Sequence, residues 1–422
     1  MVPPPVEWRG VLARSSRAFG MNIAVNYHLN REEIAPDSPG RAGRLAKVVV
    51  FDDLRAAEPF WRRLERNKAW ATPYQRFDLL AAWQHHVGVR KGITPFIVIG
   101  FDAGEEPLFL LPFGSKRTGP FGLVRFLGSK HASFNIGLWR RDLVATVTAE
   151  DIDDIVARIV AGGHRIDLLA LFSQPSSWAG IANPLACWRH QLSVDQSVRL
   201  TLASAAGFRA EDTLTPSMRT RIRKKERKLR ALDGYRYIQA SAAADIDRLL
   251  DTFFALKAVH MSSQGLGNVF AEPGVADFLR QACHDELPGG RPLIEIHALE
   301  GDGEVLALYG AVVDDLRFSS MFNTYTLGKH ARHSPGLILL QHMIADCAQR
   351  GPHSFDLGVG KAHYKSFFCK EPEPLFDTFL ALTPRGQLAA PAFRATFAAK
   401  RMIKAKPILW AGVQFLRRFR AS

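Results

Sequence analysis

The stretch of residues 325–368, YTLGKHARHSPGLILLQHMIADCAQRGPHSFDLGVGKAHYKSFF, most constrains the fold of this chain. Ser334, Pro335 and Gly336 are typical of a helix start, because serine accepts a hydrogen bond from a first-turn amide and proline pre-sets the backbone angle. Apolar residues then recur at helical spacing until Gly351 and Pro352 end the pattern. The periodic apolar residues are Leu337, Leu340, Ile344 and Cys347. A helix with one buried face is therefore predicted.

A short buried strand is predicted directly after this helix. The segment 353–360, HSFDLGVG, ends in glycines and is followed at once by His363, Tyr364 and Lys365. In open α/β sheets, ligands bind beyond the carboxyl ends of the strands. Asp356, Tyr364 and Lys365 are therefore expected at such a site.

The start of the predicted helix is also a candidate anion site. Free amides and the helix dipole attract phosphate at a helix N-terminus. Cationic and titratable side chains stand just before it, namely Lys329, His330, Arg332 and His333. An ordinary capped helix in an α/β core is the alternative interpretation of the same residues.

The order of SPG, an amphipathic helix, FDLG and YKSFF resembles one branch of the GCN5-related N-acetyltransferase (GNAT) superfamily. This is the BioF2-like branch, which includes proteins called cellulose biosynthesis protein CelD. The chain is also similar to Fem-type aminoacyl-tRNA-dependent peptidyltransferases, which are built from two such domains. The resemblance covers roughly residues 217–382 and is weaker over roughly 48–195. The common acetyltransferase loop has the form R/Q-x-x-G-x-G/A, whereas here Arg332 is followed by a single nearby glycine, Gly336.

The resemblance implies an α/β fold of two tandem GNAT-like acyltransferase domains, with mixed central sheets flanked by helices. It implies transfer of an acyl group, most simply acetyl from acetyl-CoA or another acyl-CoA, to a nitrogen or oxygen of a cell-envelope or polysaccharide precursor. Two alternatives stay open. One is a Fem-like transferase that uses aminoacyl-tRNA, and the other is a non-catalytic binding component of a polysaccharide (cellulose-type) biosynthesis complex.

The resemblance also implies roles for individual residues. Tyr364 would protonate the leaving thiolate or alkoxide, and Lys365 would neutralise phosphate or developing negative charge. Asp356 would orient them or act as a base, unless it only caps a turn at the strand end. The donor's phosphate would be held by Arg332, Ser334, Pro335, Gly336 and Leu337. The substrate-side candidates are His260, Gln264, Asn323 and Tyr325. No histidine spacing indicates a metal site.

An internal duplication is predicted from segments that recur at an offset of roughly 190 to 200 residues. LGKHARHSPGL in the second half corresponds to LGSKHASFNIGL in the first, and HSFDLG in the second half corresponds to HRIDLL in the first. The first copy has no SPG and no tyrosine and lysine after Asp167, so it is assigned to substrate binding or support. The predicted parts are a disordered segment at 1–45, a degenerate GNAT-like domain at 46–198, an acyltransferase domain at 199–385 and a basic amphipathic tail at 386–422.

The densest charge of the chain lies between the two copies, in TPSMRTRIRKKERKLRALDG. Thr215, Pro216 and Gly234 delimit a helix whose apolar stripe would pack inward. The segment Arg219–Arg230 carries eight cations, and only Glu226 offsets them. A solvated helix face is the ordinary explanation of such a run. A bound polyanion is the functional explanation. The resemblance to Fem-type enzymes implies tRNA, and the resemblance to CelD implies anionic lipid or a nucleotide-linked sugar. No sequence-specific DNA binding is predicted, because no recognisable nucleic-acid motif accompanies the charge.

Composition bounds the remaining possibilities. The formal net charge of +14 attracts phosphorylated and other anionic partners without selecting one. The four cysteines form no C-x-x-C pair, which favours a reducing cytoplasm. No apolar run approaches the roughly 18 to 20 residues of a membrane span. The tail, split by Pro407, is predicted to lie at the inner face of the membrane or to pack against the body. Met21 is an alternative start if the first segment is an extension of the gene model.

Overall fold

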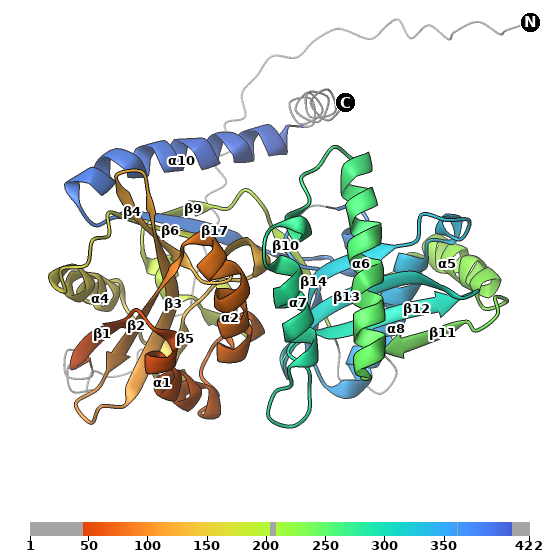
Figure 1. Ribbon diagram of the computed structural model, residues 1–422, viewed down its shortest axis with the longest axis horizontal. Coiled ribbons are helices and arrows are strands. Elements are labelled where there is room, and N and C mark those ends of the chain that lie inside the picture. The colour runs from red at the N-terminus through yellow and green to blue at the C-terminus, as the bar shows by residue number, and fades with distance from the viewer. Residues whose placement is uncertain (1–44, 203–207, 361, 407–422) are drawn as a thin grey trace, which may run out of the picture. The chain divides into compact units, whose positions relative to one another are not determined.

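The computed structural model describes residues 45–202, 208–360 and 362–406. These described residues belong to one compact unit. The predicted disordered segment lies outside the described residues up to residue 44, as does the part of the tail after residue 406. Two mixed β-sheets with helices around them make up the described fold (Figure 1).

The first sheet is built mainly from the first half of the chain. In spatial order its strands are β1 (Lys47–Phe51), β2 (Thr94–Phe101), β3 (Pro107–Thr118), β4 (Phe121–Phe126), β6 (Leu168–Pro175), β17 (Leu375–Ala381) and β9 (His190–Leu192), with β5 (Leu138–Trp139) beside β3. All neighbours are antiparallel except β4 and β6, which are parallel over two residue pairs. A separate small hairpin joins β7 (Ser177–Trp178) to β8 (Ile181–Ala182).

The second sheet repeats this plan. Its strands, in spatial order, are β11 (Arg236–Gln239), β12 (Glu295–Gly301), β13 (Glu304–Val313), β14 (Arg317–Tyr325), β15 (Ser354–Asp356), β10 (Ser197–Thr201) and β16 (Glu371–Glu373). The fourth and fifth strands, β14 and β15, are again the parallel pair, here over three residue pairs. The other neighbours are antiparallel. The same pattern of pairings in both sheets confirms the predicted tandem α/β fold.

The two sheets exchange one strand each. β10, from the end of the first half, pairs with β15 and β16 in the second sheet. β17, near the C-terminus, pairs with β6 and β9 in the first sheet. The predicted ranges 46–198 and 199–385 therefore do not coincide with the two sheets, because the second range contains a strand of the first sheet.

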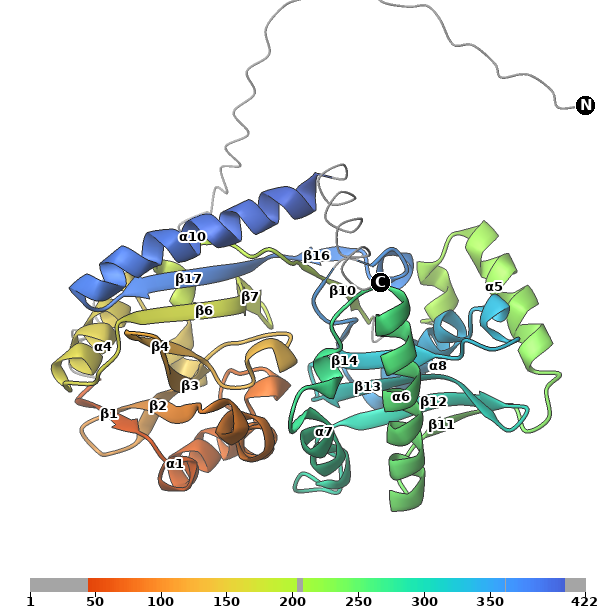
Figure 2. The same ribbon diagram turned by 45° about the horizontal axis from the view of Figure 1, so that its top comes forward.

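Helices flank both sheets, as Figure 2 shows. They are α1 (Leu54–Arg66), α2 (Phe77–Trp83), α3 (Arg141–Val144), α4 (Ala149–Ala161), α5 (Pro216–Leu229), α6 (Ala243–Ser263), α7 (Val275–His284), α8 (Pro335–Arg350), α9 (Lys365–Phe368) and α10 (Pro384–Ala405). Local sequence explains several ends. Thr148 and Asp151 form a capping box at α4, and proline stands in the first turn of α5, α8 and α10. Gly351, with φ 116°, ends α8 in the left-handed conformation that favours glycine.

The described part of the basic tail packs against the first sheet. Helix α10 lies over β6 and β17, where Phe393 and Phe397 contact Phe379, and Phe397 also contacts Phe172 (Figure 2). Phe393 and Phe397 are therefore half-buried against the first sheet. None of the described helices is long and apolar enough to cross a membrane.

Arg317 joins the two halves at the start of β14. Its guanidinium donates to both oxygens of Glu373, at 2.8 and 2.9 Å, and lies 3.9 Å from the ring centroid of Trp178. Nearby, the hydroxyls of Tyr74 and Ser319 are hydrogen-bonded at 2.9 Å. These buried contacts set the first half against the strand that leads into the candidate site.

Candidate active site

The parallel strands β14 and β15 separate shortly after they meet. Their pairing ends at Ser319 and Asp356, after which β14 runs on to Tyr325 and the other strand turns away at Gly358. Gly358 has φ 70°, and a Cβ there would stand 2.7 Å from the carbonyl oxygen of Ser320. Glycine is therefore required at this turn. The separation opens a gap at the carboxyl ends of the strands, where α/β folds bind ligands.

A cavity of about 480 Å³ occupies this region. Both halves of the chain line it. The first half and the segment after it contribute Lys130, Ala132, Ser133, Ser173 and Asp195; the second contributes Lys257, Phe270, Ser320, Met321, Phe322, Asn323, Leu357, Gly358, Val359, Tyr364 and Lys365. Three of the residues selected from the sequence, Asn323, Tyr364 and Lys365, thus lie on one cavity.

Tyr364 is held by Asn323 across the gap. The Asn323 side-chain amide donates a hydrogen bond to the Tyr364 hydroxyl oxygen at 3.0 Å. Burial raises the pKa of the Tyr364 phenol above its ordinary value, although its hydrogen bonds with Asn323 and Tyr309 act in the opposite direction. The phenol is therefore protonated at neutral pH and can donate its proton.

Lys365 points back to the turn between β15 and α9. Its ammonium donates to the carbonyl oxygens of Gly358 at 2.9 Å and Val359 at 3.3 Å. Burial lowers the pKa of Lys365 to about 8, and nearby Asp356 partly opposes this effect. The side chain thus places a cation, held by neutral acceptors, at the cavity wall.

Asp356 lies behind the cavity and is fully buried. One carboxylate oxygen accepts hydrogen bonds from the Ser319 hydroxyl at 3.0 Å and from the Gly358 amide at 2.8 Å. Burial raises the pKa of Asp356 to about 7, although Arg317 opposes the rise. This geometry stabilises the turn that carries Leu357 and Gly358 to the cavity.

Most of the cavity lining escaped the sequence analysis, including two residues with a distinct structural role, Met321 and Lys257. Met321 is the extra residue of a bulge in β14, where the register with β13 shifts between Gly310 and Ala311. A bulge takes one residue out of the hydrogen-bond ladder. Lys257, from α6, donates to the backbone oxygen of Asn323 at 3.1 Å. Neither has a local signal, because strand register and the cavity wall depend on distant segments.

The start of α8 departs from the predicted cap. Ser334 has φ 54° and makes no side-chain hydrogen bond to the first turn. Its hydroxyl accepts instead from the Lys225 ammonium at 2.7 Å, because the left-handed backbone turns the side chain towards α5. The prediction that serine caps this helix through its side chain was therefore wrong. The amides of Ser334 and Leu337 bond to the oxygens of Ala331 and Ser334, which leaves Gly336 as the amide donor available here among the described residues.

Gly336 faces open space. A Cβ added there would meet no heavy atom within 4 Å. The surroundings are cationic, since burial and the charges of Arg332, Lys228, His330 and Lys225 lower the pKa of His333. The α8 start and α5 thus present a positive surface around an accessible amide, which suits a phosphate.

The remaining substrate-side candidates lie near the end of β14. The His260 ring lies 4.6 Å from the Tyr325 ring, and its Nδ1 is 3.1 Å from the Thr324 hydroxyl. Gln264 follows the end of α6 and is exposed. None of His260, Gln264 and Tyr325 lines the 480 Å³ cavity.

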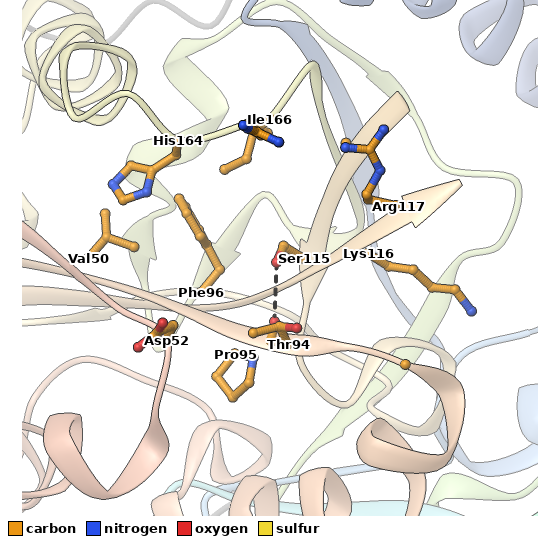
Figure 3. A pocket seen from close by; sticks show the side chains of 13 residues that line it. Val50, Asp52, Thr94, Pro95, Phe96, Ser115, Lys116, Arg117, His164 and Ile166 are labelled. Carbon is orange, nitrogen blue, oxygen red and sulfur yellow. Dashed lines mark hydrogen bonds between the residues drawn. The ribbon is translucent and has the colours of Figure 1, made fainter. Parts of the chain in front are cut away.

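A second cavity, of about 560 Å³, lies in the first half (Figure 3). Thr94 and Ser115 form its floor on neighbouring strands, while His164 and Ile166 line the opposite side. It contains none of the residues predicted for the site. Within the described part of the chain, no group of three or more His, Cys, Asp or Glu residues is placed to hold a metal ion.

Comparison with known proteins agrees with this fold. Residues 216–366 match the family described as acetyltransferase (GNAT) domain. The crystal structure of FemX is similar with a TM-score of 0.53 and 9% identity, covering 82% of this chain and 100% of that chain. The C-terminal domain of a putative lysylphosphatidylglycerol synthetase from Agrobacterium fabrum is similar with a TM-score of 0.47 and 10% identity, covering 81% of this chain and 96% of that chain. A tandem GNAT protein from the clavulanic acid biosynthesis pathway is similar with a TM-score of 0.43 and 10% identity, covering 80% of this chain and 99% of that chain.

A sequence search of curated proteins found no match. The likeness to FemX shows the fold, and the family match indicates a GNAT acyltransferase domain over residues 216–366. The chain therefore carries a GNAT acyltransferase domain within two tandem GNAT-like folds.

Proposed function

We propose that this GNAT acyltransferase moves an acyl group, most simply acetyl from acetyl-CoA, onto an amine or hydroxyl of a cell-envelope or polysaccharide precursor. The observation that carries the proposal is the Asn323–Tyr364 hydrogen bond at a cavity between separating parallel strands. A protonated phenol held at this cavity supports transfer between a donor and an acceptor bound there. The BioF2-like or CelD-type assignment is part of the same proposal.

Tyr364 serves as the proton shuttle in this proposal. The acceptor nitrogen forms a bond to the acyl carbon, and the carbon–sulfur bond of the donor breaks. Tyr364 gives its proton to the departing sulfur, and its phenolate then takes the proton that the acceptor nitrogen loses. The raised pKa of the phenol suits this order, because the proton is present before the sulfur leaves. Asn323 keeps the hydroxyl in place during both transfers.

Charge that develops on the acyl oxygen needs a fixed donor. The bulge at Met321 frees backbone from the β13–β14 ladder beside the cavity, and Lys365 supplies a cation on the same wall. Asp356 acts as a positioning residue in this scheme, since its carboxylate holds the Gly358 amide and is itself buried.

The donor's phosphate binds at the start of α8 in this proposal. Gly336 offers an accessible amide, Pro335 and Leu337 fix the first turn, and Arg332 adds a cation. Lys225 reaches the same place through its bond to Ser334. These features fit a pyrophosphate, whose negative charge a helix N-terminus attracts.

Isothermal titration with acetyl-CoA tests the proposal, using the full-length chain and two variants. Gly336→Ala fits the open space, so binding should persist. Gly336→Glu brings a carboxylate to the phosphate position, so binding should be lost. Absence of acetyl-CoA binding by the unaltered protein would contradict the proposal, as would equal binding by both variants.

Aminoacyl-tRNA is the second candidate donor, and α5 favours it. Several of its cations are ion-paired, since Arg219, Arg223 and Arg230 contact Asp212, Glu211 and Glu226. Others form no ion pair with any described residue, namely Arg221, Lys224, Arg227 and Lys228. A charged-tRNA binding assay decides between the donors if acetyl-CoA does not bind. Anionic lipid would compete for the same face.

A non-catalytic role in a polysaccharide assembly complex makes the opposite prediction for Tyr364. Turnover unchanged in both Tyr364→Phe and Lys365→Ala would favour it. We further propose a cytoplasmic location with peripheral contact through the tail. Because Phe393 and Phe397 pack against the first sheet, such contact depends on the segment after residue 406. Liposome co-sedimentation unaffected by deleting residues 407–422 would contradict it.

A further inference from the structure

Lys257 is a cation on the cavity wall that the proposed reaction does not use. It is half-buried on α6, and its ammonium donates to the backbone oxygen of Asn323 at 3.1 Å. The same ammonium lies 5.6 Å from the ring centroid of Phe270, another cavity residue. Burial lowers the pKa of Lys257. Burial thus disfavours the charge, and among the described residues only neutral groups, the Asn323 oxygen and the Phe270 ring, are placed to offset it.

No carboxylate of the described residues forms an ion pair with Lys257, although other charged groups of the cavity have partners. Asp195 is paired with Lys404, and Lys130 is paired with Glu272. Lys365 is satisfied by two carbonyl oxygens of its own turn. A half-buried ammonium without a counter-charge is unfavourable, and an anion that enters the cavity would relieve that cost.

We infer that the acceptor carries an anionic group, carboxylate or phosphate, and that Lys257 binds it. This inference rests on the proposed function and deepens it by naming the acceptor's charge. The donor's phosphate does not compete for this position, because the proposed phosphate site at Gly336 and Lys225 is outside the cavity lining.

The bonding around Asn323 also relates the anion to the proton donor. Lys257 contacts the backbone oxygen of Asn323, whose side chain holds the Tyr364 hydroxyl. An anion on Lys257 and the proton donor Tyr364 would therefore both lie beside Asn323. The inference therefore favours an acceptor whose nucleophile and anionic group belong to the same small unit, as in an amino acid or a phosphorylated amino sugar.

A binding experiment tests the anion site without turnover. Malonate serves as the anionic probe and malonamide as its uncharged counterpart, each added to the full-length chain in a thermal melt. A ligand that binds the native state raises Tm. Malonate should raise the Tm of the unaltered protein and of Lys257→Arg more than malonamide does. Lys257→Met should lose most of that difference.

The control variant for this melt is Arg117→Gln, which removes a cation from the cavity in Figure 3. It should leave the malonate effect as it is. An equal malonate effect in Lys257→Met and the unaltered protein would overturn the inference, since malonate would then bind elsewhere. Loss of the malonate effect in Arg117→Gln alone would also overturn the inference.

A transfer assay then separates the inference from the proposed function. Amine acceptors are compared in matched pairs: amino acids with their carboxamides, and phosphorylated amino sugars with the unphosphorylated sugars. A charge-assisted contact predicts about a 10- to 100-fold preference in kcat/KM for the anionic member. The preference should lie in KM, disappear in Lys257→Met and return in Lys257→Arg.

The outcomes of this assay are distinct. Transfer to both members of each pair at equal rates overturns the inference and leaves the acyltransferase proposal standing. No acetyl-CoA binding and no transfer overturns the proposed function, while the malonate experiment still decides whether Lys257 binds anions. A preference confined to one pair identifies carboxylate or phosphate as the anion.

Discussion

The side-chain amide of Asn323 donates to the hydroxyl of Tyr364 at 3.0 Å, joining the end of β14 to the turn that precedes α9. The bond spans the gap that opens where β14 and β15 separate. It fixes a proton donor in a cavity that both halves of the chain line.

Removing the Tyr364 hydroxyl should slow transfer without unfolding the protein. Tyr364→Phe keeps the ring and loses the proton, so kcat should fall by about 10²- to 10⁴-fold, the usual contribution of a positioned acid. In Asn323→Ala, kcat should fall less, because the phenol is kept but its hydroxyl is no longer held by a hydrogen bond. Thiol release from acetyl-CoA measures both, and far-UV circular dichroism checks the fold.

Stability should depend on pH through Asp356. Its pKa is raised from an ordinary value near 4 to about 7, so between these pH values the folded state binds more protons than the unfolded state. Its contribution is fully present below about pH 4 and is lost as the pH rises through about 7, with a slope of up to about 1.4 kcal/mol per pH unit. Urea unfolding of Asp356→Asn should show a flatter pH dependence over this range. Parallel curves for variant and unaltered protein would contradict the prediction.

Arg317 should be critical for stability. Arg317→Met leaves Glu373 and Asp356 buried without their cation, and breaking such a pair costs about 3–5 kcal/mol. The double variant Arg317→Met/Glu373→Gln should recover part of this loss. Arg63→Met is a control, because Arg63 pairs with Glu106 at the surface, where both side chains are exposed, and should cost less than about 1 kcal/mol. Chemical denaturation measures the free energy of unfolding of all three variants. A loss in Arg317→Met no larger than the loss in the control would refute the assignment.

The unpaired cations of α5 should matter more for donor binding than the paired ones. Arg221→Gln/Lys228→Gln removes two charges near Lys225 and His333, so acetyl-CoA affinity should fall about tenfold or more. Arg219→Gln/Arg223→Gln removes two charges already neutralised by Asp212 and Glu211 and should change affinity little. Titration of both double variants under one salt concentration makes the comparison. Equal losses would mean that only net charge matters.

Local patterns predicted much of the secondary structure. The proline signals placed the starts of α5 and α8, and Gly351 ends α8 as predicted, whereas α5 ends at Leu229, before the predicted Gly234. Such signals are readable because caps, turns and periodic apolar faces act over a few residues. The recurrence at 190 to 200 residues likewise indicated the repeated pairing pattern of the two sheets.

The candidate site was predicted only in part. Tyr364 and Lys365 lie on one cavity with Asn323, while Asp356, expected beside them, lies behind the cavity. The role given to Ser334 as a side-chain cap was wrong because its backbone is left-handed. The catalytic and binding roles themselves stay predictions. Lys257 was missed because an unpaired cation in α6 is recognised only when its surroundings are known.

The sequence by itself determined the elements of this protein and their order, because helix caps, glycine turns and apolar periodicity depend on near neighbours. Only the tertiary structure decided which sheet β10 and β17 complete, since each pairs with strands far away in the chain. It also decided which charges are paired, which are buried and which face the cavity. Hydrogen bonding and desolvation across distant segments control those properties, and no local pattern encodes them.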